Sequence, residues 1–180
     1  MALPPIRTAR LVLREPAVTD AADVHVFRGD PEVQRFNDDP MRTLAETEAF
    51  VEYLLAESAA DLRRHWALEL GGRVIGLMGL HSWQPAHRRA ELGYDLAKEH
   101  WGRGYATEAA RAILRHGFTT MRLRRVHAQT IAGNDRSVRL LTSLGFTREG
   151  TLRQHSLEPD GHFHDCAIFG LLRTEWAAAV

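Results

Sequence analysis

Hydrophobic residues change their spacing several times along this chain of 180 residues, and each change marks a new element. Apolar positions recur every three to four residues over 21–27, 43–62, 105–118 and 135–144, which is the period of a helix with one buried face. They alternate, or run together between turn residues, over 10–15, 66–70, 73–80, 90–96, 125–131, 146–156 and 162–172, which predicts strands. The order β-α-α-β-β-β-α-β-α-β-β predicts an α/β fold (an α+β mixed sheet with helices on its faces) in one domain over residues 1–180.

Polar residues and glycines between these segments predict where the elements begin and end. Thr19-Asp20 is placed to cap the first helix, and Thr43 with Glu46 forms a capping-box pattern for the second. Gly71-Gly72 between two alternating runs predicts a tight hairpin, and Gly145 predicts a helix end. The segment 29–40 is rich in Pro, Gly and Asp, so we expect a loop with one helical turn near 32–36.

A glycine turn stands between the strand at 90–96 and the helix at 105–118. Its sequence is His100-Trp101-Gly102-Arg103-Gly104-Tyr105-Ala106-Thr107-Glu108-Ala109. A strand, a glycine turn and a helix in this order direct the unpaired N–H groups of the helix start at one point. Such a point binds phosphate, so the turn predicts a phosphate-bearing ligand.

The bulk composition excludes several classes of function. Lys plus Arg and Asp plus Glu number 23 each, so no overall charge favours nucleic acid, a membrane surface or an acidic partner. A single cysteine, Cys166, rules out an internal disulfide and fits a reducing compartment. The chain has no apolar run near the ~20 residues that span a bilayer, and its start lacks the features of a signal peptide. We therefore expect a cytoplasmic protein.

Six motifs then occur in an order that resembles the GNAT superfamily of acyl-CoA N-acyltransferases. They are 8–14 (TARLVLR), Ile75-Gly76, 91–94 (ELGY), 101–109 (WGRGYATEA), 134–137 (NDRS), and Leu144-Gly145-Phe146 followed by Glu149-Gly150. Together they cover about residues 8–176. Trp101 stands where the superfamily usually has Gln or Arg, and an aromatic residue there is common in the RimJ/RimL-like branch, which acetylates N-terminal amines of ribosomal proteins.

The resemblance implies acetyl-CoA as the donor, an amine as the acceptor and a sheet splayed between the strands at 90–96 and 125–131. The positions that would bind the cofactor are the main chain of the first of these strands, the glycine turn and the start of the next helix: Tyr94, Asp95, Leu96, Trp101, Gly102, Arg103, Gly104, Tyr105, Ala106, Thr107, Asn134 and Ser137. Read without the resemblance, Gly102 and Gly104 form an ordinary turn, and Asn134 is an N-cap.

Acetyl transfer also needs a base for the amine proton and an acid for the leaving thiolate. Glu91 is the candidate base, near the acceptor end of the gap, and its plain alternative is an ion pair with Arg88 or Arg89. Ser137 is the candidate acid, with Tyr105 as the weaker choice. The acceptor pocket is expected near the loop 29–40 and the turn 158–161. Its candidate lining residues are Phe36, Asn37, His81, Trp83 and His155.

Other interpretations stay open at this point. His162, His164, Asp165 and Cys166 invite a zinc site, but a second pair at ligand spacing is lacking, so no metal is expected. A catalytically silent acyl-CoA-binding module would carry the same motifs. A nucleotide-binding domain fits poorly, because the turn has no Walker lysine. The sequence does not select among protein N-termini, polyamines and other amines as acceptors, and the resemblance makes a homodimer one expectation.

Overall fold

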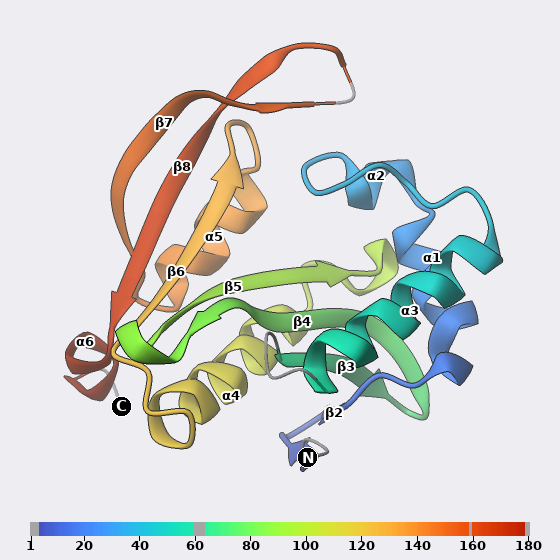
Figure 1. The fold of residues 1–180 in the computed structure, drawn as a ribbon, viewed down its shortest axis with the longest axis horizontal. Helices are drawn as coiled ribbons and strands as arrows, with labels where there is room; N and C mark the ends of the chain where they lie inside the picture. The colour runs from blue at the N-terminus through green and yellow to red at the C-terminus, as the bar shows by residue number, and fades with distance from the viewer. Residues whose placement is uncertain (1–3, 60–63, 159, 179–180) are drawn as a thin grey trace.

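The computed structural model describes residues 4–59, 64–158 and 160–178, which form a mixed sheet covered by helices on both faces (Figure 1). The strands are β1 (Ile6–Arg7), β2 (Val12–Arg14), β3 (Arg64–Leu70), β4 (Arg73–Gln84), β5 (Arg89–Leu96), β6 (Arg125–Ile131), β7 (Thr147–Leu157) and β8 (Phe163–Leu172). The helices are α1 (Ala21–Arg28), α2 (Pro31–Gln34), α3 (Leu44–Ala59), α4 (Tyr105–Thr119), α5 (Asp135–Ser143) and α6 (Arg173–Ala178), with short 3₁₀ turns at 18–20, 85–87 and 98–100.

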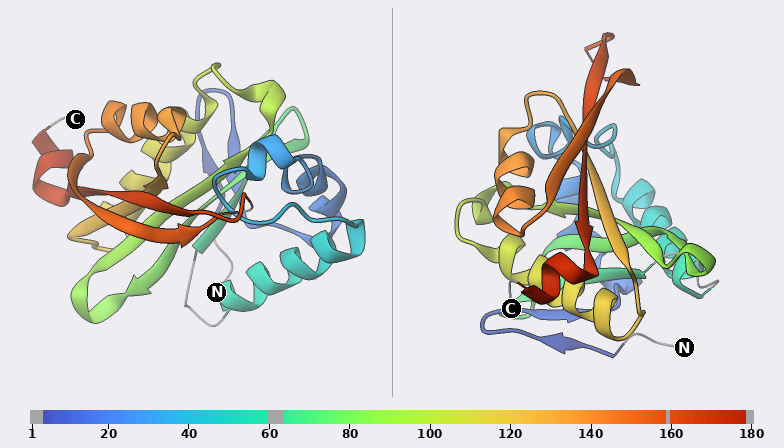
Figure 2. Two further views of the ribbon diagram at one scale, coloured as in Figure 1. Left: turned by 90° about the horizontal axis from the view of Figure 1, so that it is seen from above. Right: turned by 90° about the vertical axis from the view of Figure 1, so that its left-hand side faces the viewer.

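The sheet runs in the order β1-β2-β3-β4-β5-β6-β8-β7, and only β5 and β6 pair in parallel. Helices α1 and α3 cover one face and α4 and α5 cover the other, as Figure 2 shows from above. Each face has its own core. Trp66, Leu80 and Ile113 belong to the core under α4, whereas Phe27 and Leu77 belong to the core under α1 and α3. Burial on both faces explains the continuous apolar runs at 66–68 in β3 and 74–80 in β4.

Strands β5 and β6 pair over only three residues and then separate. Arg89 to Glu91 pair with Arg125 to His127, after which β5 continues to Leu96 and β6 to Ile131 without a partner on these edges. Figure 1 shows β6 rising away from β5, so the sheet opens into a V. The predicted splay is therefore present, and it begins directly after Glu91.

The predicted order of elements is confirmed, and two further short elements, one strand and one helix, were not predicted. β1 and α6 are additional, and the helical turn expected at 32–36 is α2 at Pro31–Gln34. The predicted strands and long helices are present with bounds shifted by a few residues, and residues 60–62 of the second predicted helix lie outside the described residues. The hairpin at Gly71-Gly72 joins β3 to β4. Within the described residues, no helix combines the length and apolar composition that crossing a bilayer requires.

Asp20 is the N-cap residue of α1 as predicted, but the side-chain hydrogen bond expected of a cap is missing. Asp20 makes no side-chain cap bond, because its carboxylate accepts hydrogen bonds from Arg14 and from the Ala17 N–H instead. The capping box of α3 is half formed. Thr43 Oγ1 accepts from the Glu46 N–H, while the Glu46 carboxylate accepts from the N–H of Arg42.

Candidate functional site

The V between β5 and β6 connects two cavities on opposite faces of the sheet. The larger cavity has a volume of about 1290 Å³ and contains the glycine turn and the start of α5. The smaller has a volume of about 400 Å³ and lies toward α1 and α3. We call them the donor cleft and the acceptor cavity, after the two substrates that the sequence resemblance implies. Both are lined by Gly93, Tyr94 and Asp95 from β5 and by Gln129, Thr130 and Ile131 from β6. A molecule in one cavity can therefore reach the other through the opening in the sheet.

The glycine turn has the backbone geometry that the sequence predicted. Gly102 has φ +70° and Gly104 has φ +80°, a region that side-chain-bearing residues rarely adopt. Gly104 is the N-cap of α4, so the first N–H groups of that helix, from Tyr105 to Thr107, have no partner within the helix. Gly102, Gly104 and residues 105–107 all line the donor cleft. This arrangement suits a phosphate group.

Residues from the start of the chain hold this turn in place. Arg10 Nη1 donates to the carbonyl of Arg103 at 2.9 Å, and Arg10 Nε donates to Glu108 at 2.7 Å. Thr8 Oγ1 donates to the same carboxylate at 2.6 Å. Burial alone would raise the pKa of Glu108, but these hydrogen bonds outweigh it and lower the pKa. Glu108 thus stays ionised in the first turn of α4, where the helix dipole favours a negative charge.

Two of the predicted cofactor residues, Arg103 and Trp101, differ in position or in contacts from what the sequence suggested. Arg103 is exposed and does not line the donor cleft. Trp101 does line it, and its Nε1–H donates to the Leu96 carbonyl at 2.7 Å, which ties the turn to the end of β5. The Arg136 guanidinium lies 4.0 Å from the centre of the Trp101 ring. Arg35 also lines the cleft, as do Arg136 and Arg139, two cationic side chains that the sequence reading missed. Their position in the first turns of the helix capped by Asn134 was the available signal.

Tyr94 and Ser137 meet across the opening of the sheet. Tyr94 Oη lies 2.7 Å from Ser137 Oγ, and Ser137 is only 7% exposed. Asn134 Oδ1 accepts from the Ser137 N–H at 3.2 Å, which confirms the predicted N-cap. Burial raises the pKa of Tyr94 to about 12, despite the opposing hydrogen bond with Ser137. Both hydroxyls are therefore protonated at neutral pH and can donate a proton or a hydrogen bond.

On β5, the three predicted positions Tyr94, Asp95 and Leu96 all line the donor cleft. Their far edge pairs with β4, and the edge facing β6 has no strand partner after Glu91. The Leu96 carbonyl accepts from Trp101. Main-chain groups on this free edge can hydrogen-bond to an extended ligand lying in the V.

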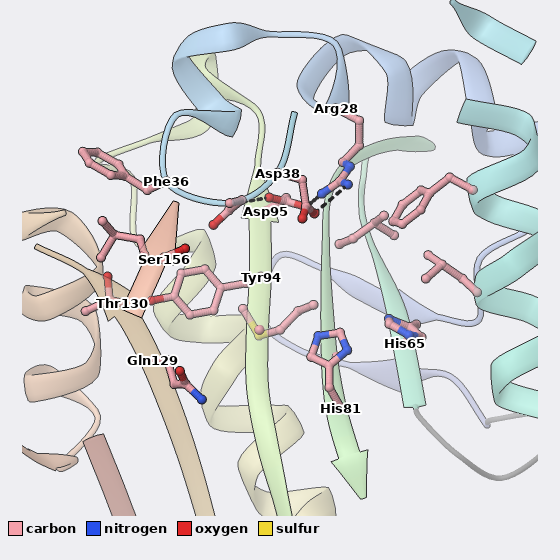
Figure 3. A pocket seen from close by; sticks show the side chains of 18 of the residues that line it. Arg28, Phe36, Asp38, His65, His81, Tyr94, Asp95, Gln129, Thr130 and Ser156 are labelled. Atoms are coloured by element: carbon pink, nitrogen blue, oxygen red, sulfur yellow. Dashed lines mark hydrogen bonds and ion pairs between the residues drawn. The ribbon is translucent and has the colours of Figure 1, made fainter. Parts of the chain in front are cut away.

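The acceptor cavity is shaped by an ion-pair cluster that the sequence reading missed (Figure 3). Arg28, at the end of α1, donates to Asp95 and to Asp38, each at 2.9 Å, and its side chain is 6% exposed. Asn37 also donates to Asp95. Burial alone would lower the pKa of Arg28, but the charges of Asp95 and Asp38 outweigh it and raise the pKa. The cluster joins α1 and the loop after α2 to the strand that borders the V.

Four of the five expected pocket residues line the acceptor cavity: Phe36, Asn37, His81 and His155. The fifth, Trp83, does not, since it packs against the core under α4. His65 also lines the cavity, and its ring contacts that of His81 at 4.8 Å between centroids. Cys166 is buried in the wall, and burial raises the pKa of its thiol.

Glu91 lies where β5 and β6 still pair, so its expected place at the acceptor end of the gap is wrong. It lines neither cavity, and its Oε2 lies 3.6 Å from Nε2 of His127 on β6. Strand alternation nevertheless puts it on the same face of β5 as Gly93 and Asp95. Arg89, one of the alternative partners, donates from Nε to Gln84.

The histidines near the last hairpin do not converge on one point. His164 Nε2 lies 2.7 Å from Asp160, and Asp165 accepts from the Gln154 N–H. Across the described residues, no three His, Cys, Asp or Glu side chains are grouped to hold a metal ion.

Comparison with known proteins gives one consistent result. The family described as "Acetyltransferase (GNAT) domain" matches residues 10–147. The uncharacterised N-acetyltransferase p20 of Bacillus licheniformis is 32% identical over 173 residues, which cover 94% of this chain and 97% of that protein. The crystal structure of the acetyltransferase (GNAT family) from Bacillus anthracis is 25% identical with a TM-score of 0.85, covering 96% of this chain and 100% of that one.

A structure of RimL, a ribosomal L7/L12 alpha-N-protein acetyltransferase, in complex with coenzyme A has a TM-score of 0.88. It covers 94% of this chain and 98% of its own, at 20% identity. At that identity the likeness concerns the fold.

Proposed function

The chain belongs to the acetyltransferase (GNAT) domain family and is an N-acetyltransferase, and we propose that it transfers the acetyl group of acetyl-CoA directly to a primary amine. The observation that carries the proposal is the opening between β5 and β6, which is lined on both sides of the sheet by the same residues of the two strands. In this reading the donor enters from the side of α4 and α5, and the acceptor enters from the side of α1 and α3.

The donor cleft fits coenzyme A in three respects. The N–H groups of residues 105–107 and the glycines before them would hold the pyrophosphate. Arg136 and Arg139 would add charge-assisted hydrogen bonds to phosphate oxygens. The free edge of β5 at 94–96 would pair with the amide groups of the pantetheine arm, so that the thioester reaches the opening.

Tyr94 and Ser137 would supply the proton that the leaving group needs. The amine attacks the thioester carbonyl, a C–N bond forms, and the C–S bond breaks as its electron pair leaves on sulfur. The thiolate then takes a proton from the hydroxyl pair, which lies at the opening and stays protonated at neutral pH. Ser137 is thus retained as a candidate acid, acting with Tyr94.

Glu91 would serve the opposite end of the proton path. It lies on the face of the acceptor cavity but below the opening, beside His127. From this position the carboxylate is too far from the opening to contact the amine directly. It can instead stabilise a positive charge that forms on a neighbouring side chain. We therefore propose that Glu91 stabilises the protonated form of the group that accepts the proton of the amine.

An acceptor screen tests the proposal. Purified protein is incubated with acetyl-CoA and a panel of N-terminal peptides, amino acids and polyamines, with free thiol and acetylated product both measured. We expect CoA-dependent thermal stabilisation and turnover of at least one amine. Stabilisation by CoA without turnover of any amine would instead indicate a silent acyl-CoA-binding module, and absence of both would contradict the assignment of the donor cleft.

A further inference from the structure

His81 of β4 lies directly over a glycine at the edge of the opening. A Cβ atom at Gly93 would lie 2.6 Å from His81 Nε2 and 2.8 Å from its Cδ2, so the ring occupies the space that a side chain at 93 would take. Gly93 is one of the residues shared by the donor cleft and the acceptor cavity. In Figure 3 the His81 ring lies beside β4, with Tyr94 on the far side of β5. The imidazole thus stands where the two substrates would meet.

The position of this ring is fixed from behind. His65 of β3 contacts it edge-on at 4.8 Å between ring centroids. A second glycine makes room for both rings, since a Cβ atom at Gly79 would lie 2.8 Å from His65 Nδ1 and 3.2 Å from His81 Cε1. His65 is 4% exposed, whereas His81 is half-buried, so His81 is the ring that a molecule in the cavity can touch.

Asp95, Tyr94 and Cys166 of the acceptor cavity are poorly suited to accept a proton from an amine, and of its other two histidines His65 is buried and His155 is exposed. Both oxygens of the Asp95 carboxylate already accept hydrogen bonds, Oδ2 from Arg28 and Oδ1 from Asn37. Tyr94 and Cys166 have raised pKa values and stay protonated at neutral pH. An imidazole titrates near neutrality in its ordinary state, which is the range in which a general base works best.

We propose that His81 is the general base of the transfer reaction, a role that rests on the function proposed above. As the amine nitrogen bonds to the thioester carbon and the C–S bond breaks, the amine loses one proton to Nε2 of His81. The sulfur gains one proton from the Tyr94–Ser137 pair on the other side of β5, so charge and protons balance. The imidazolium then releases its proton to solvent through the acceptor cavity, and the hydroxyl pair regains one proton from solvent, so both groups return to their starting states.

The described groups around the ring are compatible with this role. Glu91 is the register partner of His81 on β5, and its carboxylate stabilises the imidazolium as it forms. His127 lies beyond Glu91 on β6, and His65 lies behind on β3. Arg28 is neutralised by its two aspartates. His155 of β7 is exposed in the wall of the same cavity.

The test compares His81→Gln with His87→Gln, a matched change in an exposed residue that lines neither cavity. For the wild type, kcat/KM is measured against pH with two amines from the panel whose own pKa values differ. If kcat/KM falls at low pH because the acceptor amine becomes protonated, the midpoint of the fall differs between the two amines. If it falls because a group of the enzyme becomes protonated, the midpoint is the same for both. The wild-type profile is informative even if a variant folds poorly.

We expect the wild type to show an acceptor-independent fall at low pH. His81→Gln should lose that fall and lower kcat/KM by about 10²–10⁴-fold, with unchanged stabilisation by CoA. His87→Gln should behave as the wild type. A wild-type profile that follows only the acceptor, or a His81→Gln enzyme with wild-type kcat/KM, would overturn the role of His81 alone. A wild type that binds CoA and acetylates no amine would overturn the proposed function together with it.

Discussion

The hydroxyl of Tyr94 on β5 and the hydroxyl of Ser137 on α5 lie 2.7 Å apart, although 43 positions separate them in the chain. The contact spans the V at the point where β5 and β6 have separated. It places two protonated groups beside the path that we propose for the pantetheine arm. The pair therefore links the shape of the sheet to the chemistry that we propose for it.

Removing either hydroxyl should slow the transfer without weakening cofactor binding. Tyr94→Phe and Ser137→Ala should each lower kcat by about 10- to 100-fold, because each leaves the thiolate without its nearest proton donor. The double variant should be little slower than the slower single variant, since the two groups act as one unit. Steady-state kinetics together with CoA-dependent thermal shifts check this. Multiplicative losses would show that the hydroxyls act separately, and an unchanged kcat would restrict Ser137 to the helix start.

Adding a methyl group at Gly104 should weaken CoA binding specifically. Gly104→Ala places a Cβ on a residue with φ +80° that lines the cleft, so the turn must shift away from the phosphate-binding position. Gly161→Ala is the matched control, because Gly161 has φ +79° and does not line the cleft. Both should cost about 1 kcal/mol of stability, and only the first should lose affinity, by tenfold or more, in calorimetric titration with CoA. Equal affinities of the two variants for CoA would contradict the proposal that the glycine turn binds the pyrophosphate.

Replacing Arg136 should reduce both the affinity for CoA and its sensitivity to salt. Arg136→Ala removes a guanidinium from the cleft and should weaken binding by about tenfold at low ionic strength. Arg111→Ala provides the comparison, since Arg111 is exposed on α4 and lines neither cavity. Dissociation constants at low and high salt measure the effect. A variant with the affinity and the salt dependence of Arg111→Ala would exclude a phosphate contact.

Neutralising Asp95 should disturb the acceptor side of the site. Asp95→Asn leaves the buried Arg28 with Asp38 as its charged partner in the cluster, and we expect a loss of about 3 kcal/mol of stability. The KM for the amine should rise, because the loop bearing Asn37 and Asp38 is no longer held to β5, while CoA affinity stays unchanged. Arg28→Met combined with Asp95→Asn should cost less than the sum of the single changes. Strict additivity in chemical denaturation would show that the pair is not coupled.

The stability of the fold should fall in acid partly through Asp20. Burial alone would raise the pKa of this carboxyl, but hydrogen bonds from Arg14 and from the Ala17 N–H outweigh it and lower the pKa. A carboxyl with a lowered folded-state pKa stabilises the protein above its unfolded value of about 3.9, and this contribution is lost as the pH falls further.

Thermal unfolding of the wild type and of Asp20→Asn between pH 2 and 7 measures this contribution. The difference in stability should be constant above about pH 5 and should shrink below about pH 4. A difference that does not change over the whole range would rule out the ion pair as its source.

The sequence alone determined the local structure of the glycine turn at 101–104. The apolar and polar pattern of the strand before the turn and of the helix after it depends only on residues close in the sequence. The two glycines indicate a backbone conformation that other residues avoid. For the same reason the strands, the long helices and the N-cap at Asn134 could be predicted. The hydrogen bonds of the Asp20 carboxylate could not be predicted in this way. The carboxylate accepts from Arg14 and does not cap α1, and this choice depends on how β2 lies against α1.

Only the tertiary structure decided which distant residues share the opening. Arg28 and Asp95 are 67 positions apart, and Thr8 and Glu108 are 100 apart, yet each pair is in hydrogen-bond contact. Such pairs follow from the order of the strands and from the residue at which β5 and β6 separate, and neither has a local signature. That separation begins just after Glu91 and leaves its carboxylate below the opening, whereas His81 reaches over Gly93 from the neighbouring strand. The glycine turn thus depends on short-range backbone preferences. The groups that we propose to react are brought together by long-range packing.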